Sequence, residues 1–181
     1  VITSVDHYSG LINELKKNKG STSLKFREKM SRLAFGETAY YDAVISNYFN
    51  KFNNINFPKR KILYTNLIEN LRYGENPHQI GAFYSQNIKN KLEQLHGKTL
   101  SYNNYSDIFA ALTISKSLPK NTGTAIVKHG NPCGVSALKS NLDSYKSALD
   151  SDPISAFGGI VSCNYKITQK LALILNKIFL E

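Results

Sequence analysis

The chain has 181 residues, a hydrophobic content of 41% and a formal net charge of +10 at pH 7. This length and apolar content suffice for a buried core, in one domain or in parts of two. No apolar stretch of the sequence is long enough to cross a bilayer, which excludes a typical membrane-spanning protein.

The positive charge is compatible with nucleic acid, a membrane surface or anionic small molecules as partners. The basic residues are mostly lysines scattered along the chain, and the aromatic residues follow helical core spacings instead of forming a stacking platform. We therefore expect small-molecule ligands, and neither nucleic acid nor membrane as a partner. The two cysteines, Cys133 and Cys163, form no disulfide framework, which indicates a reduced, cytoplasmic protein.

Both ends of the chain are expected to be interior points of a longer protein. Residue 1 is Val1 and not a start methionine. At the other end, the apolar helical pattern of residues 169–181 stops without a capping residue.

Residues 1–49 are predicted to form amphipathic helices. The first has apolar residues at helical spacing after Asp6, which is a candidate N-cap. Two more stretches, residues 23–35 and 37–49, share this periodicity and meet at Gly36, where we expect a kink or junction. No spacing of ionisable residues in this part suggests a site.

Residues 50–61 are polar and rich in turn-forming residues, which is typical of a linker. We therefore place a domain boundary near residue 55. Residues 62–70 follow, and they are too short to distinguish a strand from a helix. Residues 80–85 are predicted to form a strand.

The stretch from Leu71 to Gln79 cannot form one regular element, because Gly74 and the Asn76-Pro77 pair impose turns. Arg72 lies in this loop and suits bidentate recognition of a phosphate or a carboxylate. An exposed arginine in an ordinary surface turn is the alternative. A second polar loop follows at residues 96–107.

A helix is predicted over residues 108–118, with Ser106 or Asp107 as its N-cap. A turn and a β-branched run from Ala125 to Val127 come next, and the run is predicted to be a buried strand.

The strand from Ala125 to Val127 stops at two ionisable residues, Lys128 and His129. Residues 130–134 contain glycine, asparagine and proline, which predicts an irregular loop. Ligands of α/β sheets bind beyond the carboxyl ends of the strands, where this pair would present a cation and a proton acceptor in adjacent positions. The alternative is a solvated lysine and a hydrogen-bonded histidine.

The remaining sequence continues to alternate between helix and strand. A helix is expected around residues 142–149, a strand over residues 160–163, and a last helix after the N-cap Thr168. Gly158-Gly159 either lets a ligand approach the backbone closely or makes an ordinary turn before the strand. This alternation predicts an α/β layered domain.

Four segments of the chain form a combined signature: residues 71–79, 98–107, 128–134 and 152–159. Their most distinctive parts are RYGENPHQ, KHGNPCG and SAFGG. In order and spacing they resemble the bifunctional purine biosynthesis family that combines AICAR formyltransferase and IMP cyclohydrolase. Residues 1–49 resemble the end of the cyclohydrolase domain, so the resemblance covers nearly the whole chain.

The resemblance implies that residues 1–55 are the C-terminal helices of the IMP cyclohydrolase domain. Residues 56–181 would be the N-terminal half of the AICAR formyltransferase domain, an α/β subdomain similar to the cytidine deaminase fold. The implied reaction moves a formyl group from the co-substrate 10-formyltetrahydrofolate to AICAR, giving FAICAR, which the intact enzyme cyclises to IMP. The intact protein is expected to be a homodimer, and this chain alone is expected to be inactive.

The family pattern also implies roles for individual residues. His129 would take the proton of the attacking amine, and Lys128 would stabilise the oxyanion or protonate the leaving folate nitrogen. Five residues would bind the substrate: Arg72, Tyr73, Asn104, Phe157 and Gly158.

The similarity to deaminases does not extend to their zinc site. Zinc deaminases use a His-x-Glu pair and a Pro-Cys-x-x-Cys pair. Here Asn131 stands two residues after His129, and Ser136 occupies the position of the second cysteine. We therefore expect no metal. A basic RNA-binding module and a metal-dependent deaminase are the two alternatives to a formyltransferase.

Overall fold

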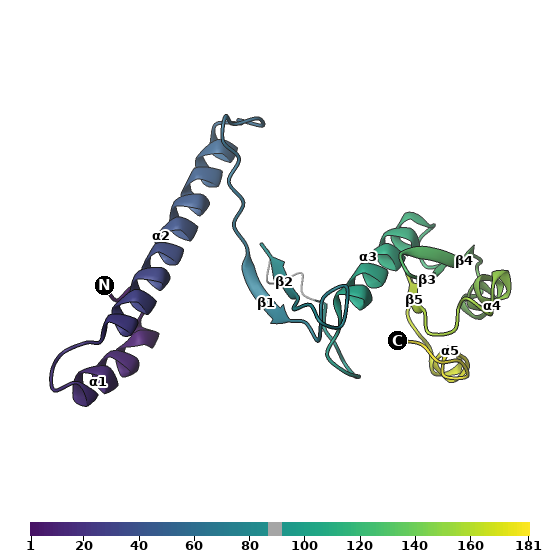
Figure 1. Cartoon of the computed structure of the whole chain (residues 1–181). Coiled ribbons are helices and arrows are strands. Elements are labelled where there is room, and N and C mark those ends of the chain that lie inside the picture. Colours follow the sequence, from purple (N-terminus) through teal and green to yellow (C-terminus); the bar gives the residue numbers. More distant parts are fainter. Residues whose placement is uncertain (87–91) are drawn as a thin grey trace. The chain divides into compact units, whose positions relative to one another are not determined.

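The computed structural model of the chain describes residues 1–86 and 92–181. These residues form two compact units, Val1–Asn66 and Leu67–Glu181, and each is described by itself (Figure 1). The division falls between Asn66 and Leu67, further along the chain than the predicted position near residue 55. The assignment of the two parts to a cyclohydrolase and a formyltransferase domain stays a prediction.

The first unit is helical, as its periodicity predicts. It contains a short 3-10 helix η1 and two α-helices: η1 Val5–His7, α1 Tyr8–Lys17 and α2 Leu24–Phe52. The Ser4 hydroxyl accepts a hydrogen bond from the Asp6 amide at 3.2 Å, so the helical turn begins earlier than predicted and Ser4, not Asp6, is its cap. Ser23 caps α2 in the same way, with the Phe26 amide as donor.

The helix α2 runs through Gly36 without interruption, so the predicted junction at this residue is wrong. A single glycine costs an α-helix only about 1 kcal/mol relative to alanine. The remaining residues of this 29-residue helix continue the backbone hydrogen bonds on both sides. Gly36 has no neighbouring atom within 4 Å of the position that a Cβ would take.

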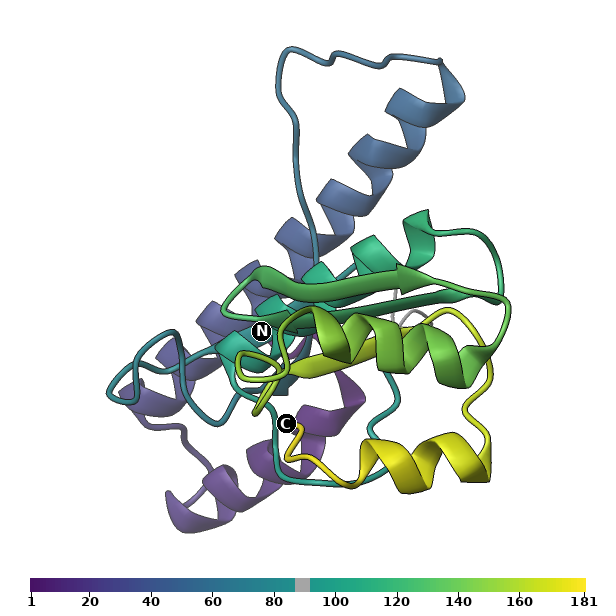
Figure 2. The same ribbon diagram turned by 90° about the vertical axis from the view of Figure 1, so that its right-hand side faces the viewer.

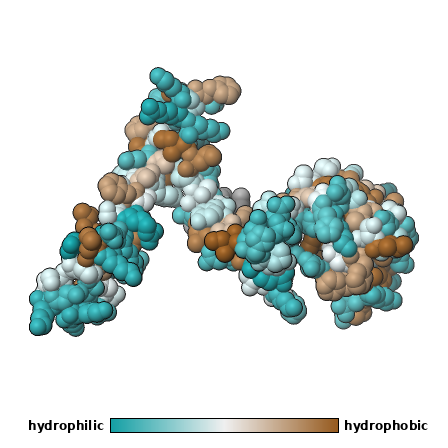
Figure 3. Space-filling model, in the orientation of Figure 1, coloured by the Kyte–Doolittle hydropathy of each residue, from teal (hydrophilic) through white to brown (hydrophobic). Residues whose placement is uncertain are grey.

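The segment after α2 packs back on the helix. The Asn47 side chain donates to the carbonyl of Ile62 at 2.9 Å, and the rings of Tyr40 and Tyr64 meet edge to face with centroids 5.4 Å apart. These contacts explain why the first unit extends beyond the polar linker. Large apolar and aromatic side chains nevertheless stay exposed along α2, among them Phe35, Tyr41, Tyr48, Phe49 and Phe52. Figure 3 shows hydrophobic, brown patches on the surface of the chain.

The second unit combines helices with two small sheets, which confirms the predicted mixed α/β class. Its strands are β1 Asn66–Asn70, whose first residue is the last of the first unit, β2 Ala82–Ser85, β3 Gly123–Lys128, β4 Asn131–Ala137 and β5 Ile160–Cys163. Its helices are α3 Tyr102–Ser117, α4 Asn141–Ser151 and α5 Gln169–Leu175. The strand predicted for residues 160–163 and the helix cap at Thr168 are confirmed. The likeness to the cytidine deaminase fold stays a prediction.

The three-stranded sheet has the order β4-β3-β5, and β3 is antiparallel to both neighbours. Helices α3 and α4 lie on opposite faces of this sheet (Figure 2). The central strand β3 is buried along most of its length, because one helix covers each of its faces. The core between the sheet, α4 and α5 contains Ile126, Tyr145, Ala148, Ala156 and Leu171.

Two predicted boundaries near this sheet are wrong. Residues 131–134 form the start of β4 and not an irregular loop, because β3 and β4 pair as a hairpin with Gly134 opposite Ile126. The helix predicted to begin at residue 108 begins at Tyr102, where Ser101 caps it through the amide of Asn104. Ser106 and Asp107 therefore lie inside α3 and do not cap it.

The last helix is also shorter than its apolar pattern suggests. The helix α5 ends at Leu175, and Asn176 is its C-cap. After this point, Leu180 forms an isolated parallel β-bridge with Gly159, the residue before β5.

Buried hydroxyl groups connect the layers of the second unit. The Thr124 hydroxyl lies 3.0 Å from the Ser144 hydroxyl and 2.5 Å from that of Tyr165. On the other side of the sheet, the Ser115 hydroxyl lies 2.7 Å from that of Ser162. Because each of these polar groups has a partner, they can be buried without a large desolvation cost.

Two tyrosines of this unit should resist ionisation until the protein unfolds. Burial is the largest cause that raises the pKa of Tyr165, to about 12, and burial also raises the pKa of Tyr105, helped by the hydrogen bond that its hydroxyl donates to Glu69. In the unfolded chain both should ionise near pH 10. The stability that the neutral phenols provide is therefore complete below about pH 10 and lost as the pH rises toward 12.

An alkaline titration followed by tyrosinate absorbance and circular dichroism tests this expectation. Tyr105 and Tyr165 should ionise only together with the loss of the helical signal, and replacing both with Phe should remove their part of the late absorbance change. The buried Tyr145, whose pKa burial also raises, should still contribute to it. Reversible ionisation of Tyr105 and Tyr165 while the helical signal persists would contradict the expectation.

Candidate functional site

The Lys128-His129 pair lies at the β3–β4 hairpin. Lys128 ends β3 and is half-buried, whereas His129 is exposed in the turn. His129 and Gly130 have φ angles of 53° and 74°, so both turn residues adopt the left-handed conformation. Two-residue turns of this kind match the twist of the flanking strands. The Asn131 side chain donates to the His129 carbonyl at 3.0 Å, and the following strand begins there.

The carboxylate of Asp107 holds this turn from α3. One oxygen accepts from the His129 amide at 3.1 Å, and the other accepts from the Gly130 amide at 2.6 Å. Sequence reasoning assigned Asp107 only a capping role. The interaction joins residues 22 positions apart, so no local pattern indicates it.

Lys128 is held on the other side of the hairpin. Its ammonium donates to the Phe157 carbonyl at 2.7 Å. Its nitrogen is also 3.9 Å from the position that a Cβ on Gly158 would take. Gly158 has a φ of 73°, a conformation that side chains rarely adopt, and its amide donates to the Phe179 carbonyl at 2.8 Å. Lys128, Phe157 and Gly158 are thus brought together.

Arg72 and Tyr73 form a second group in the loop after β1. The Arg72 guanidinium donates to the Tyr73 hydroxyl at 3.2 Å and lies 4.9 Å from the centre of its ring. The Arg72 amide donates to the Leu100 carbonyl, and the Tyr102 amide donates to the Tyr73 carbonyl. These backbone contacts fix the loop beside the start of α3.

Asn104, the remaining predicted binding residue, is buried, and both the oxygen and the nitrogen of its side chain form hydrogen bonds. Its side-chain oxygen accepts from the amide and the hydroxyl of Ser101, which completes a capping box. Its side-chain nitrogen donates to the Glu181 carboxylate. Asn104 therefore secures the start of α3 in this structure, and a ligand would have to displace Glu181 to reach its amide group.

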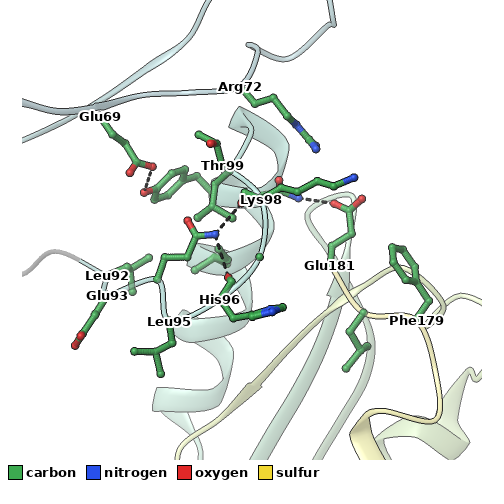
Figure 4. A pocket seen from close by; sticks show the side chains of 17 residues that line it. Glu69, Arg72, Leu92, Glu93, Leu95, His96, Lys98, Thr99, Phe179 and Glu181 are labelled. Carbon is green, nitrogen blue, oxygen red and sulfur yellow. Dashed lines mark hydrogen bonds between the residues drawn. The ribbon is translucent and has the colours of Figure 1, made fainter.

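A cavity of about 820 Å³ adjoins Arg72 and Asn104 (Figure 4). Its wall carries side chains of both charges, among them Arg72, Lys98, Glu69 and Glu181. Lys128, His129 and Gly158 do not line it. Phe179 connects the two groups, because it lines the cavity and its ring centre lies 5.6 Å from that of Phe157. Neither Phe179 nor Glu181 has a motif around it that singles it out in the sequence.

Cys133 lies on β4, beyond the hairpin turn. Burial is the main cause that raises the pKa of its thiol, and the charge of Asp152 raises it further, against a lowering by Lys128. A raised pKa keeps the thiol protonated near neutral pH, so it is a weak nucleophile there. Within residues 1–86 and 92–181, no three His, Cys, Asp or Glu side chains are grouped so that they could hold a metal ion.

In the described part of the chain, no helix combines the length and the apolar character that a membrane crossing requires. The second unit is a mixed α/β structure with a cavity lined by apolar and charged side chains and a Lys-His pair on a hairpin. These features are those of an α/β domain that binds small molecules.

Comparison with known proteins identifies the family. Residues 1–181 match the AICARFT/IMPCHase bienzyme family over their whole length, and the chain belongs to this family. It is 42% identical over 187 residues to the bifunctional purine biosynthesis protein PurH of Bradyrhizobium diazoefficiens, covering 100% of this chain and 35% of that protein. PurH of Thermoanaerobacter sp. and of Persephonella marina are each 42% identical and are covered to 36%. The chain thus spans about a third of the length of these relatives.

Proposed function

We propose that the protein containing this chain acts in de novo purine biosynthesis as an AICAR formyltransferase that also has IMP cyclohydrolase activity. The formyl group comes from the co-substrate 10-formyltetrahydrofolate and is transferred to AICAR, and the product FAICAR is then cyclised to IMP. No metal takes part. The observation that carries the proposal is a Lys-His pair held on a hairpin beside Phe157 and Gly158, in a chain that belongs to this family.

The reaction needs proton transfer and charge stabilisation at one place. The 5-amino group of AICAR is conjugated to a carboxamide, so it is a weak nucleophile and must lose a proton as it attacks the formyl carbon. His129 accepts this proton, because a neutral imidazole is a suitable base near pH 7. Its exposed position on the turn leaves it accessible to a substrate.

Lys128 acts on the tetrahedral intermediate. Its ammonium either stabilises the oxyanion that forms or protonates the departing folate nitrogen. The hydrogen bond to the Phe157 carbonyl supports this role, because it directs the ammonium toward the backbone of Phe157-Gly158. Gly158 then lets AICAR approach this backbone, and Phe157 packs nearby.

Nucleotide binding is proposed for the second group. Arg72 anchors the phosphate of AICAR by charge-assisted hydrogen bonds, and Tyr73 orients the guanidinium through its hydroxyl and ring. Because the lining of the cavity includes Arg72 but not Lys128, this nucleotide must extend from one group to the other, past Phe179.

The complete protein is proposed to be a cytoplasmic homodimer whose active site draws on both subunits.

Formation of FAICAR from AICAR and 10-formyltetrahydrofolate by the complete protein tests the proposal. We expect turnover without added metal, and no measurable turnover from these 181 residues alone. A complete protein that lacks this activity at saturating substrates would overturn the proposed function. Robust formyl transfer by the isolated chain would show that the chain is not inactive on its own.

Replacing Arg72 with Ala should weaken the binding of AICAR to the complete protein by about 10-fold or more, because a charged hydrogen bond to phosphate contributes roughly 1.5–3 kcal/mol. Isothermal titration calorimetry measures this directly. Arg60→Ala is a matched control, since Arg60 is exposed and belongs to the first unit, outside the cavity. Equal affinities for the two variants would remove Arg72 from the binding site.

A further inference from the structure

The turn that carries His129 has a backbone conformation that needs support. His129 is not a glycine, yet its φ is 53°, in the left-handed region that a side chain disfavours. The turn is exposed, so packing against other side chains does not fix it. Without a further interaction, the imidazole would sample several positions relative to Lys128.

The carboxylate of Asp107 supplies that interaction. Its two oxygens each accept one backbone hydrogen bond, from the His129 amide at 3.1 Å and from the Gly130 amide at 2.6 Å. Hydrogen bonds to a charged acceptor are stronger than neutral ones, and a two-point attachment fixes orientation as well as distance. Both amides belong to the turn, so the carboxylate fixes the turn itself.

The other end of this attachment is rigid. Asp107 lies in the second turn of α3, whose start is fixed by the capping box of Ser101 and Asn104. The helix α3 packs on the sheet, and its buried Ser115 hydroxyl bonds the Ser162 hydroxyl of β5. Lys128 is fixed separately, by the Phe157 carbonyl. The two members of the pair are thus positioned by different parts of the fold.

We propose that Asp107 is a positioning residue for His129, which holds the turn so that the imidazole meets the amine of the substrate. This inference rests on the proposed formyl transfer. Both carboxylate oxygens are engaged by backbone amides, so Asp107 acts through the turn and does not itself exchange protons with the substrate. A misplaced catalytic group lowers kcat more than it lowers the affinity for the substrate. The reason is that the reacting atoms must be aligned in the transition state, whereas binding does not require this alignment.

The test compares Asp107→Ala and Asp107→Asn in the complete enzyme. We expect kcat to fall by about 100-fold for the alanine variant and less for the asparagine variant, whose side-chain oxygen can still accept from one amide. KM for AICAR should change by less than about 3-fold. The groups proposed to bind the nucleotide are not held by Asp107, so their contribution to binding should be the same in the variant. Asp143→Asn removes the same charge from an exposed position on α4 and should leave kcat unchanged.

Two further readouts separate positioning from a general loss of structure. Amide hydrogen exchange at His129 and Gly130 should accelerate in both Asp107 variants, while exchange in the central strand β3 stays slow. In a His129→Ala background, adding Asp107→Ala should lower kcat no further, because a residue that acts only through His129 has nothing left to position.

The outcomes distinguish this inference from the proposed function. An unmutated enzyme without formyl transfer would overturn the proposed function. An active enzyme whose Asp107→Ala variant keeps kcat within about 2-fold would overturn the positioning role. The positioning role would also be overturned if Asp107→Ala lowered kcat in the His129→Ala background as much as it does alone. Unchanged hydrogen exchange at the amides of His129 and Gly130 would overturn it as well. If the alanine variant fails to fold, the asparagine variant gives the same comparisons.

Discussion

Replacing His129 with Ala in the complete protein is expected to lower kcat for formyl transfer by about 100- to 10,000-fold, the usual contribution of a general base. The amine of AICAR would then have to lose its proton to water, which is a poorer acceptor and is not fixed in position. Nucleotide affinity should stay nearly unchanged, because the phosphate is proposed to bind Arg72 and not His129. The measurement is steady-state kinetics of FAICAR formation, with calorimetry for AICAR binding.

His129→Asn is the matched variant for this experiment. Asparagine tolerates the left-handed conformation that the turn requires at φ 53°, whereas alanine adds backbone strain there. Asparagine cannot accept the proton as an imidazole does, so both variants should lose activity to a similar degree. An asparagine variant that retains activity within about 10-fold of the unmutated enzyme would show that the imidazole is not the base.

Gly134→Ala is expected to destabilise the second unit by about 3 kcal/mol or more, at the upper end of the cost of overpacking a core. A Cβ at residue 134 would stand 1.8 Å from the carbonyl oxygen of Ala148 and 2.7 Å from its carbonyl carbon. These are backbone atoms of α4, so relief requires the helix to move away from β4. The free energy of unfolding in urea, followed by circular dichroism, measures the effect.

Two controls test the cause of this loss. Gly36→Ala lies in α2 with no atom within 4 Å of the new Cβ, and it should stabilise its helix by about 0.5–1 kcal/mol. Adding Ala148→Gly to Gly134→Ala should restore little, because the obstructing oxygen belongs to the backbone. A Gly134→Ala protein as stable as the unmutated chain would show that β4 and α4 are packed less closely than described.

The predicted elements that proved correct depend on neighbouring residues in the sequence. The strand at residues 160–163, the helix cap at Thr168 and the helical character of the first unit all follow from periodicity and side chains that bond nearby amides. The stretch that was predicted as an irregular loop depends instead on pairing with another strand. Residues 131–134 contain glycine and proline, yet they form a strand because β3 offers them a pairing edge.

The candidate site also has features that local sequence indicates and features that only tertiary contacts explain. The sequence alone indicated the Lys128-His129 pair and Arg72 through their motifs, and it placed the chain in its family. Tertiary structure decided that the pair lies on a hairpin held by Asp107, that Phe157 binds the ammonium of Lys128, and that Asn104 is occupied by Ser101 and Glu181.

What the sequence by itself determined about this protein is therefore its local chemistry: which stretches favour helix or strand, and which residue types stand together in motifs. Only the tertiary structure decided which of these residues meet, such as Asp107 with the turn at His129, or Gly134 with Ala148. The physical reason is that periodicity and capping act over a few residues. Contacts between α3 and the hairpin, or between β4 and α4, depend on how the whole second unit packs.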